Sequence, residues 1–176
     1  LDGVVLEKQL SYWKQQLSGN LPVLQLPIDY PPGETANYQG GNVVLSLDKE
    51  LTTAIKTLSQ QQGATVFMTM LAAFKVLLCR HTGMEDIIVG SPIAGRNHHR
   101  TEELIGCFLN LLPLRTDLSG NPSFGELLKQ VRQVTLSAYS NQDIPFEKLV
   151  EELRPERSLS RHPFFDVMFN MINTPQ

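Results

Sequence analysis

IGCFLNLLPLRT, at residues 105–116, is the strand-like run on which the fold depends, and DIIVGS at residues 86–91 is a second one. The polar loop PIAGRNHHRTEEL separates the two runs. Short apolar runs that are bounded by polar or turn residues are typical of buried β-strands. We therefore expect the centre of the fold to be a sheet that contains both segments.

Helices are expected on either side of these strands. Leu6, Leu10, Trp13 and Leu17 recur at helical spacing and predict an amphipathic helix over residues 5–17. The remaining predicted elements are a proline-rich surface loop at 20–41, a strand at 42–47 (NVVLSL), a helix capped by Asp48 and ending at Gly63, an all-round apolar core helix capped by Thr65 and ending at Gly83, a helix at 123–139, a short helix starting at Pro145, and a β-like stretch at 164–173.

The order of these elements predicts an α/β or α+β fold in which helices pack on a mixed sheet. The 176 residues carry 15 basic and 18 acidic side chains, a net charge of −3, and 41% of them are hydrophobic. This composition excludes a disordered tail and a strongly basic nucleic-acid binder. The longest apolar run, residues 64–79, is short for a membrane span and contains Lys75. We expect a cytoplasmic protein without nucleic-acid or membrane partners.

No metal site or disulfide is expected, because Cys79 and Cys107 lie in apolar stretches without ligand spacing. The pair His98 and His99 could supply a general base, but no serine, cysteine or acid is placed by sequence to complete a catalytic set. The alternative is a solvated or phosphate-contacting loop. Ser91 has no recognisable base, so it is a lining residue at most. The residues alone show no complete active site.

Three segments resemble the last three core motifs of nonribosomal peptide synthetase condensation domains. They are IGCFLNLLPLR (105–115), NQDIPFEKLVEEL (141–153) and RSLSRHPFFDVMFN (157–170), and they occur in the family's order. The resemblance implies a two-lobed domain in which each lobe is similar to chloramphenicol acetyltransferase and a tunnel runs between the lobes. Such domains join an aminoacyl or peptidyl thioester on one carrier protein to an aminoacyl amine on another.

The family's catalytic signature, HHxxxDG, belongs to the N-terminal lobe. Here the adjacent histidines His98 and His99 are followed by Glu103 and Leu104, where the signature requires Asp-Gly. The resemblance therefore implies that residues 1–176 are the C-terminal lobe, truncated at both ends and without a catalytic residue. It also implies that no cofactor is bound directly, since phosphopantetheine is carried by partner carrier proteins. The implied partners are the N-terminal lobe, peptidyl carrier domains and an adenylation domain.

Physical chemistry gives expected places to individual residues beside the resemblance. Asn110 is either a satisfied core amide or a tunnel-facing group, Arg115 is expected in an ion pair, and Asp143 is expected to cap the helix that follows it. Arg96 either contacts the phosphate of the phosphopantetheine arm or holds its own turn. The candidates for lining the tunnel are Ser91, Arg96, Asn110 and Gln142, and the structural motif residues are Gly106, Phe108, Arg115, Asp143, Pro145, Phe146, Arg157, Arg161 and Pro163.

Other interpretations of the sequence remain open. An epimerization domain is the nearest alternative within the superfamily, and a heterocyclization domain is disfavoured by the asparagine in GCFLNLLPLR. A non-catalytic docking platform for carrier and adenylation domains is a different class of function. A free-standing acyltransferase that acts on small molecules is the last alternative.

Overall fold

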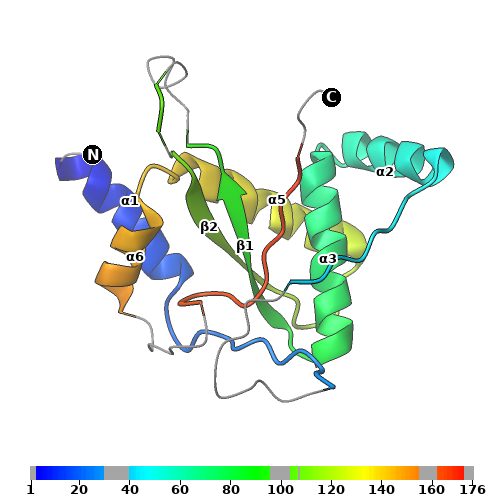
Figure 1. The fold of residues 1–176 in the computed structure, drawn as a ribbon, viewed down its shortest axis with the longest axis horizontal. Coiled ribbons are helices and arrows are strands. Elements are labelled where there is room, and N and C mark those ends of the chain that lie inside the picture. The colour runs from blue at the N-terminus through cyan, green and yellow to red at the C-terminus, as the bar shows by residue number, and fades with distance from the viewer. Residues whose placement is uncertain (1–2, 30–39, 96–103, 107, 155–161, 173–176) are drawn as a thin grey trace.

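The computed structural model describes residues 3–29, 40–95, 104–106, 108–154 and 162–172. Five helices surround two strands in these ranges (Figure 1). In chain order the elements are α1 (Gly3–Gln16), α2 (Lys49–Gln61), α3 (Val66–Thr82), β1 (Asp86–Ile93), β2 (Asn110–Asp117), α5 (Phe124–Ser140) and α6 (Phe146–Leu153).

The central sheet pairs β1 with β2 in an antiparallel register that runs from Asp86 opposite Asp117 to Ile93 opposite Asn110. On its other side β1 meets the C-terminal segment through one parallel bridge, between Gly90 and Met168. The Gly90 N–H donates to the Val167 carbonyl at 3.0 Å. The described sheet is therefore small and antiparallel, with one isolated parallel bridge beside β1.

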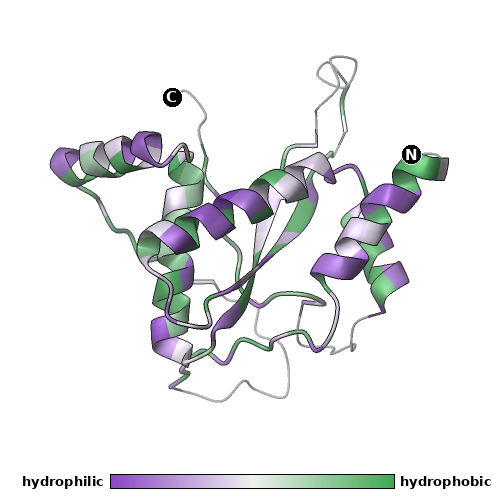
Figure 2. Cartoon of the chain, turned by 180° about the vertical axis from the view of Figure 1, so that it is seen from behind, coloured by the Kyte–Doolittle hydropathy of each residue, from purple (hydrophilic) through white to green (hydrophobic). Residues whose placement is uncertain are grey.

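Helices pack the sheet into one core. Figure 1 shows α1 and α6 side by side at one edge, with α5 and α3 at the back and at the opposite side. Buried side chains from every layer meet there: Trp13, Leu71, Ile87, Leu114, Leu127 and Leu149. Figure 2 shows that α3 is apolar over most of its length, whereas α5 carries polar residues on its outward side. The core helix expected at this position is confirmed.

Local capping signals fix the helix ends as the sequence predicts. The Asp48 carboxylate accepts from the Leu51 N–H at 2.7 Å and begins α2. Thr65 accepts from the Met68 N–H at 3.2 Å and begins α3, which ends at Gly83 in the left-handed conformation, with φ of 70°. A side-chain oxygen at the N-cap satisfies an N–H group that has no partner within the helix.

Three strand predictions differ from the structure. Residues 42–47 form no strand, and Val43, Val44 and Leu45 are 99%, 89% and 83% exposed. A strand needs a neighbour for its N–H and C=O groups, and no described segment pairs with this one. The run at 105–116 becomes a strand only from Asn110, because the preceding described residues have no strand opposite them. The stretch at 164–173 contributes one bridge instead of a strand.

No single helix among the described residues is long and apolar enough to cross a membrane; only α2 and α3 taken together meet that test, and they are bent by 105° relative to each other.

Gly90 makes the approach of the C-terminal segment possible, and its replacement tests that contact. A Cβ at this position would strike the ring of Phe165, which is itself buried and stacked on His162. We expect Gly90→Ala to lower the free energy of unfolding by about 1–3 kcal/mol, because overpacking a filled core forces strain. Gly125→Ala in α5 is the control, since a Cβ there meets nothing within 4 Å. Urea unfolding of both variants measures the difference, and equal stability would contradict the packing argument.

Candidate functional site

Asn110 and Gln142 meet at one end of the strand pair, where Ile93 lies opposite Asn110, whereas Arg115 lies toward the other end, opposite Ile88. Ser91 lies on β1 near this end and is only 2% exposed. Gln142 is half-buried in the turn between α5 and α6, and its Nε2 donates to the Tyr139 carbonyl at 2.7 Å. Three sequence-predicted residues, Arg96, Arg157 and Arg161, lie outside the described residues.

Asn110 organises this end of the sheet through four hydrogen bonds. Its Nδ2 donates to the carbonyls of Gln142 at 2.9 Å and Ile144 at 2.8 Å. Its Oδ1 accepts from the N–H groups of Leu111 and Phe146, both at 2.9 Å. An amide side chain has two donor and two acceptor positions, so all four are used. The Asn110 amide is therefore satisfied by backbone groups of its own chain.

Asp143 does not cap α6, contrary to the expectation from sequence. The helix begins after Pro145, which makes no side-chain cap, and the first free N–H, that of Phe146, is taken by Asn110. The Asp143 carboxylate accepts instead from Gln9 Nε2 at 2.9 Å, and its N–H donates to Gln9 Oε1 at 3.2 Å. The helix starts at Phe146, three residues beyond Asp143, so the Asp143 carboxylate is free to join the turn to α1.

Aromatic packing supports the other motif residues at this end. The Phe146 ring meets the ring of Phe164 edge-on at 5.5 Å and lies 5.0 Å from that of His162. Burial lowers the pKa of His162, while Asp166 acts in the opposite direction. Pro163 is half-buried next to them, and Phe108 is also half-buried whereas Gly106 is exposed. These contacts are those of a packed scaffold.

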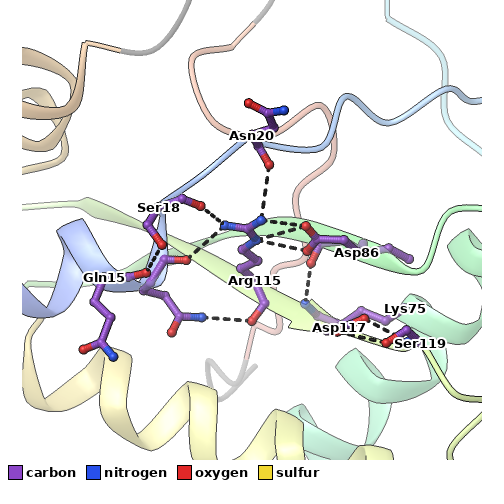
Figure 3. Close-up of polar contacts among 10 residues, drawn as sticks. Gln15, Ser18, Asn20, Lys75, Asp86, Arg115, Asp117 and Ser119 are labelled. Carbon is purple, nitrogen blue, oxygen red and sulfur yellow. Dashed lines mark hydrogen bonds and ion pairs between the residues drawn. The ribbon is translucent and has the colours of Figure 1, made fainter.

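Arg115 forms the ion pair that the sequence predicts, and Figure 3 shows how many segments it joins. Its Nε and Nη2 bind the two oxygens of Asp86, with the shortest distance 2.7 Å from Nη2 to Oδ2. Its Nη1 donates to the carbonyl of Ser18 at 2.7 Å, and its Nη2 donates to that of Asn20 at 3.3 Å. The hydrogen bond to Asp86 raises the pKa of Arg115 above its usual value. The guanidinium therefore links β1, β2 and the chain that leaves α1.

Lys75 is buried, which the sequence analysis does not predict. It lies on α3, is 0% exposed, and donates to the carbonyls of Ile87 at 3.2 Å and Leu114 at 2.7 Å and to the Thr116 hydroxyl at 3.0 Å. Burial lowers the pKa of Lys75 to about 7, although Asp86 opposes the shift. The signal that could have revealed it is a lysine in a helix that is apolar on all sides.

The structure thus defines a class of protein in which helices pack on a small antiparallel sheet, and motif residues such as Asn110 and Arg115 bind other parts of their own chain. Residues 4–176 match the family model described as Condensation domain. The chain therefore belongs to the condensation domain family. The fold class expected from the sequence, including the likeness to chloramphenicol acetyltransferase, is confirmed by the solved structures that it resembles.

The matching relatives are peptide synthetases. The chain is 56% identical over 173 residues to one of the linear gramicidin synthase proteins of Brevibacillus parabrevis, a match that covers 98% of this chain and 3% of that protein. It is 45% identical over 170 residues to surfactin synthase subunit 1 of Bacillus subtilis (strain 168), covering 97% and 5%. The chain thus spans a few per cent of the length of the curated relatives it matches.

Solved structures show the same fold. The X-domain from teicoplanin biosynthesis superposes with a TM-score of 0.88 at 30% identity, covering 95% of this chain and 37% of that one. A four-domain nonribosomal peptide synthetase, holo-AB3403, superposes with a TM-score of 0.91 at 23% identity, covering 96% of this chain and 13% of that one. The second likeness concerns the fold alone.

Replacing Asn110 tests its organising role. Asn110→Leu would leave two carbonyls and the Phe146 N–H without their partner, so we expect the free energy of unfolding to fall by about 2–4 kcal/mol. Gln142→Leu is the matched control because it removes an amide with one side-chain hydrogen bond, to the Tyr139 carbonyl. The free energy of unfolding of Gln142→Leu should fall by about 1 kcal/mol. Denaturant unfolding compares the two, and equal losses would reject the organising role.

The buried amine of Lys75 predicts a pH-dependent stability. With a pKa of about 7 when folded against 10.5 for an ordinary lysine, the unfolded chain holds one more proton between these values. The free energy of unfolding should therefore rise with pH from 7 to 10, relative to Lys75→Met, by at most about 1.4 kcal/mol per pH unit. The exposed Lys56 provides the control variant Lys56→Met. A difference between wild type and Lys75→Met that does not change with pH would mean that the ammonium stays charged.

Proposed function

We propose that this chain forms one lobe of a condensation domain that makes amide bonds between carrier-bound aminoacyl or peptidyl thioesters. The observation that carries the proposal is the match of the condensation family model to residues 4–176. In this proposal the lobe supplies a wall of the reaction tunnel and the surfaces on which neighbouring domains rest. The amide-forming histidine motif is supplied by another part of the same domain.

The chain's own chemistry supports a binding and shaping role. In the sequence, His98 and His99 are followed by Glu103 and Leu104 and so do not complete HHxxxDG. Within the described ranges, no cluster of three or more histidine, cysteine or acidic side chains could hold a metal ion. The motif residue Asn110 uses all its hydrogen-bonding positions on backbone groups of its own chain. In this proposal these residues stabilise the fold, and other residues of the condensation domain carry out the proton transfer.

Exposed apolar surface supports a larger assembly around this lobe. Val43, Val44 and Leu45 are almost fully exposed in succession, and Leu47 is 44% exposed. Contiguous exposed apolar residues mark surfaces that another partner covers. We propose that the partners are the second lobe of the domain, carrier domains that bring phosphopantetheine, and an adenylation domain. Arg96 is proposed to contact the phosphate of that arm, because guanidinium binds phosphate through paired charged hydrogen bonds.

A non-catalytic docking platform is the second candidate function. It is favoured by one comparison: the X-domain of teicoplanin biosynthesis, which has the same fold, was solved in a complex with the protein OxyB. That structure superposes on this chain with a TM-score of 0.87 at 30% identity. In this alternative the lobe holds partner proteins and takes no part in forming a bond.

An assay of amide formation distinguishes the two candidates. The chain alone should give no condensed product when it is incubated with loaded donor and acceptor carriers, because it lacks the histidine motif. The whole condensation domain that contains the chain should give product, followed by intact-protein mass spectrometry. Product from the chain alone, above the background of carriers without it, contradicts the proposed division of labour. A whole domain that binds carriers and gives no product identifies a platform.

A further inference from the structure

The C-terminal segment leaves the sheet with an open edge beside β1 (Figure 1). The Gly90 N–H donates to the Val167 carbonyl at 3.0 Å, and the Phe169 N–H donates to the Gly90 carbonyl at 2.8 Å. In a parallel bridge, the residue between these two, Met168, directs its own N–H and C=O away from β1, and alternation gives Asn170 the same direction. Neither backbone has a hydrogen-bond partner among the described residues. Met168 and Asn170 form the open edge.

The opposite edge of the sheet, that of β2, is protected. Pro113 has no N–H to offer there, and the Arg115 carbonyl accepts from Gln16 Nε2 at 3.1 Å. Natural sheets protect their edges in such ways because bare N–H and C=O groups bind a strand of another chain. The segment 167–172 has no charge and no proline, and Met168 is 49% exposed. The open edge is therefore suited to receive a further strand.

Helix α3 determines which side chains that further strand needs. Phe67, Met70, Phe74 and Leu77 recur on α3 at helical spacing and share one face. The Phe169 ring lies 5.6 Å from the rings of both Phe67 and Phe74, whereas Leu77 is 51% exposed. The C-terminal segment thus covers only part of this apolar face. A strand that lies beside the open edge and covers the rest needs an apolar side chain at every second position.

The run 42–47 of the same chain has this composition. Val43, Leu45 and Leu47 stand at alternate positions, and all three are exposed. The run contains no charge and no proline, and its backbone makes no hydrogen bond within the part of the chain that the structure describes. Its six residues are the usual length of a strand. One molecule therefore displays both an open edge and an unpaired strand, and the two do not pair with each other.

We propose that two copies of this chain associate by exchanging strands, so that the run 42–47 of each copy pairs with the open edge of the other. The apolar side chains of the run then cover the free part of the α3 face. The exchange is reciprocal, so the same contact is made twice and the dimer closes on itself. This inference goes beyond the proposed function, because it concerns the chain of 176 residues in solution.

Pairing with the open edge is more favourable than pairing of the two runs with each other. Two free runs would form a ribbon of two strands, which is marginally stable in water when nothing packs against it. The open edge belongs to a sheet that already packs on helices, and Phe169 of its segment contacts α3. A strand added there gains backbone hydrogen bonds and buries its apolar side chains at the same time.

Sedimentation velocity of the 176-residue chain under reducing conditions tests the association. We expect a dimer whose fraction rises as the concentration is raised to about 100 µM, the regime of weak interfaces. Leu45→Glu should weaken dimerisation by at least about tenfold, because it would bury a carboxylate against the apolar face of α3. Val4→Glu on α1 is the matched control, since Val4 is 80% exposed and Leu45 is 83% exposed. It should leave the dimer unchanged.

Mixing two variants tests the reciprocal geometry. Asn170→Pro removes an N–H that points to the open edge and leaves the contacts of Val167 and Phe169 with β1 in place. A Leu45→Glu copy keeps its open edge and an Asn170→Pro copy keeps its run, so a heterodimer retains one of the two contacts and each homodimer retains none. We expect both variants to be monomeric alone and to form heterodimers when mixed, detected by native mass spectrometry.

Any of four results overturns the inference. A wild-type chain that stays monomeric has no such contact, and a dimer that Leu45→Glu does not weaken forms elsewhere. A dimer that Asn170→Pro leaves intact while Leu45→Glu abolishes it joins the two runs to each other. A mixture without heterodimers excludes the exchange. None of these measurements uses amide formation by the whole domain, so failure of this inference is distinguishable from failure of the proposed function.

Discussion

The bidentate contact between Arg115 and Asp86 is the interaction on which the rest of the described structure depends. Asp86 begins β1 and Arg115 lies near the end of β2, so the pair locks the strands together where the two acidic residues of the register oppose each other. The same guanidinium holds the carbonyls of Ser18 and Asn20. A planar fork with five donors can serve three segments at once, which a lysine at this position could not do.

The buried side chain of Lys75 is the second basic group that holds the strands together. Lys75 reaches from α3 to a carbonyl of each strand and to Thr116, so it joins the helix layer to both strands. A sheet of two strands is marginal by itself and needs packing against helices. Here that packing is reinforced by polar contacts that fix the register, because the amine finds three acceptors only when the strands are correctly paired. The α3 helix and the strand pair are thus mutually dependent.

Much of the fold is predictable from sequence because helix signals are local. Asp48, Thr65 and Ser123 each cap a helix through atoms within three residues, which the sequence displays directly. Strands depend on partners elsewhere in the chain, so the apolar run at 42–47 predicts a strand that the described residues do not complete. The site is harder to predict. Nothing in the sequence shows that Asn110 would replace Asp143 at the start of α6, since that exchange depends on how β2 meets the turn.

The exposed run NVVLSL at 42–47 has a consequence for handling and engineering this chain. It combines β-branched and apolar residues with no charge and no proline, which is the composition of segments that assemble into intermolecular sheets. The first charged residue on its C-terminal side is Asp48, which caps α2. This run is therefore an aggregation hotspot, and one lysine placed within it would act as a gatekeeper.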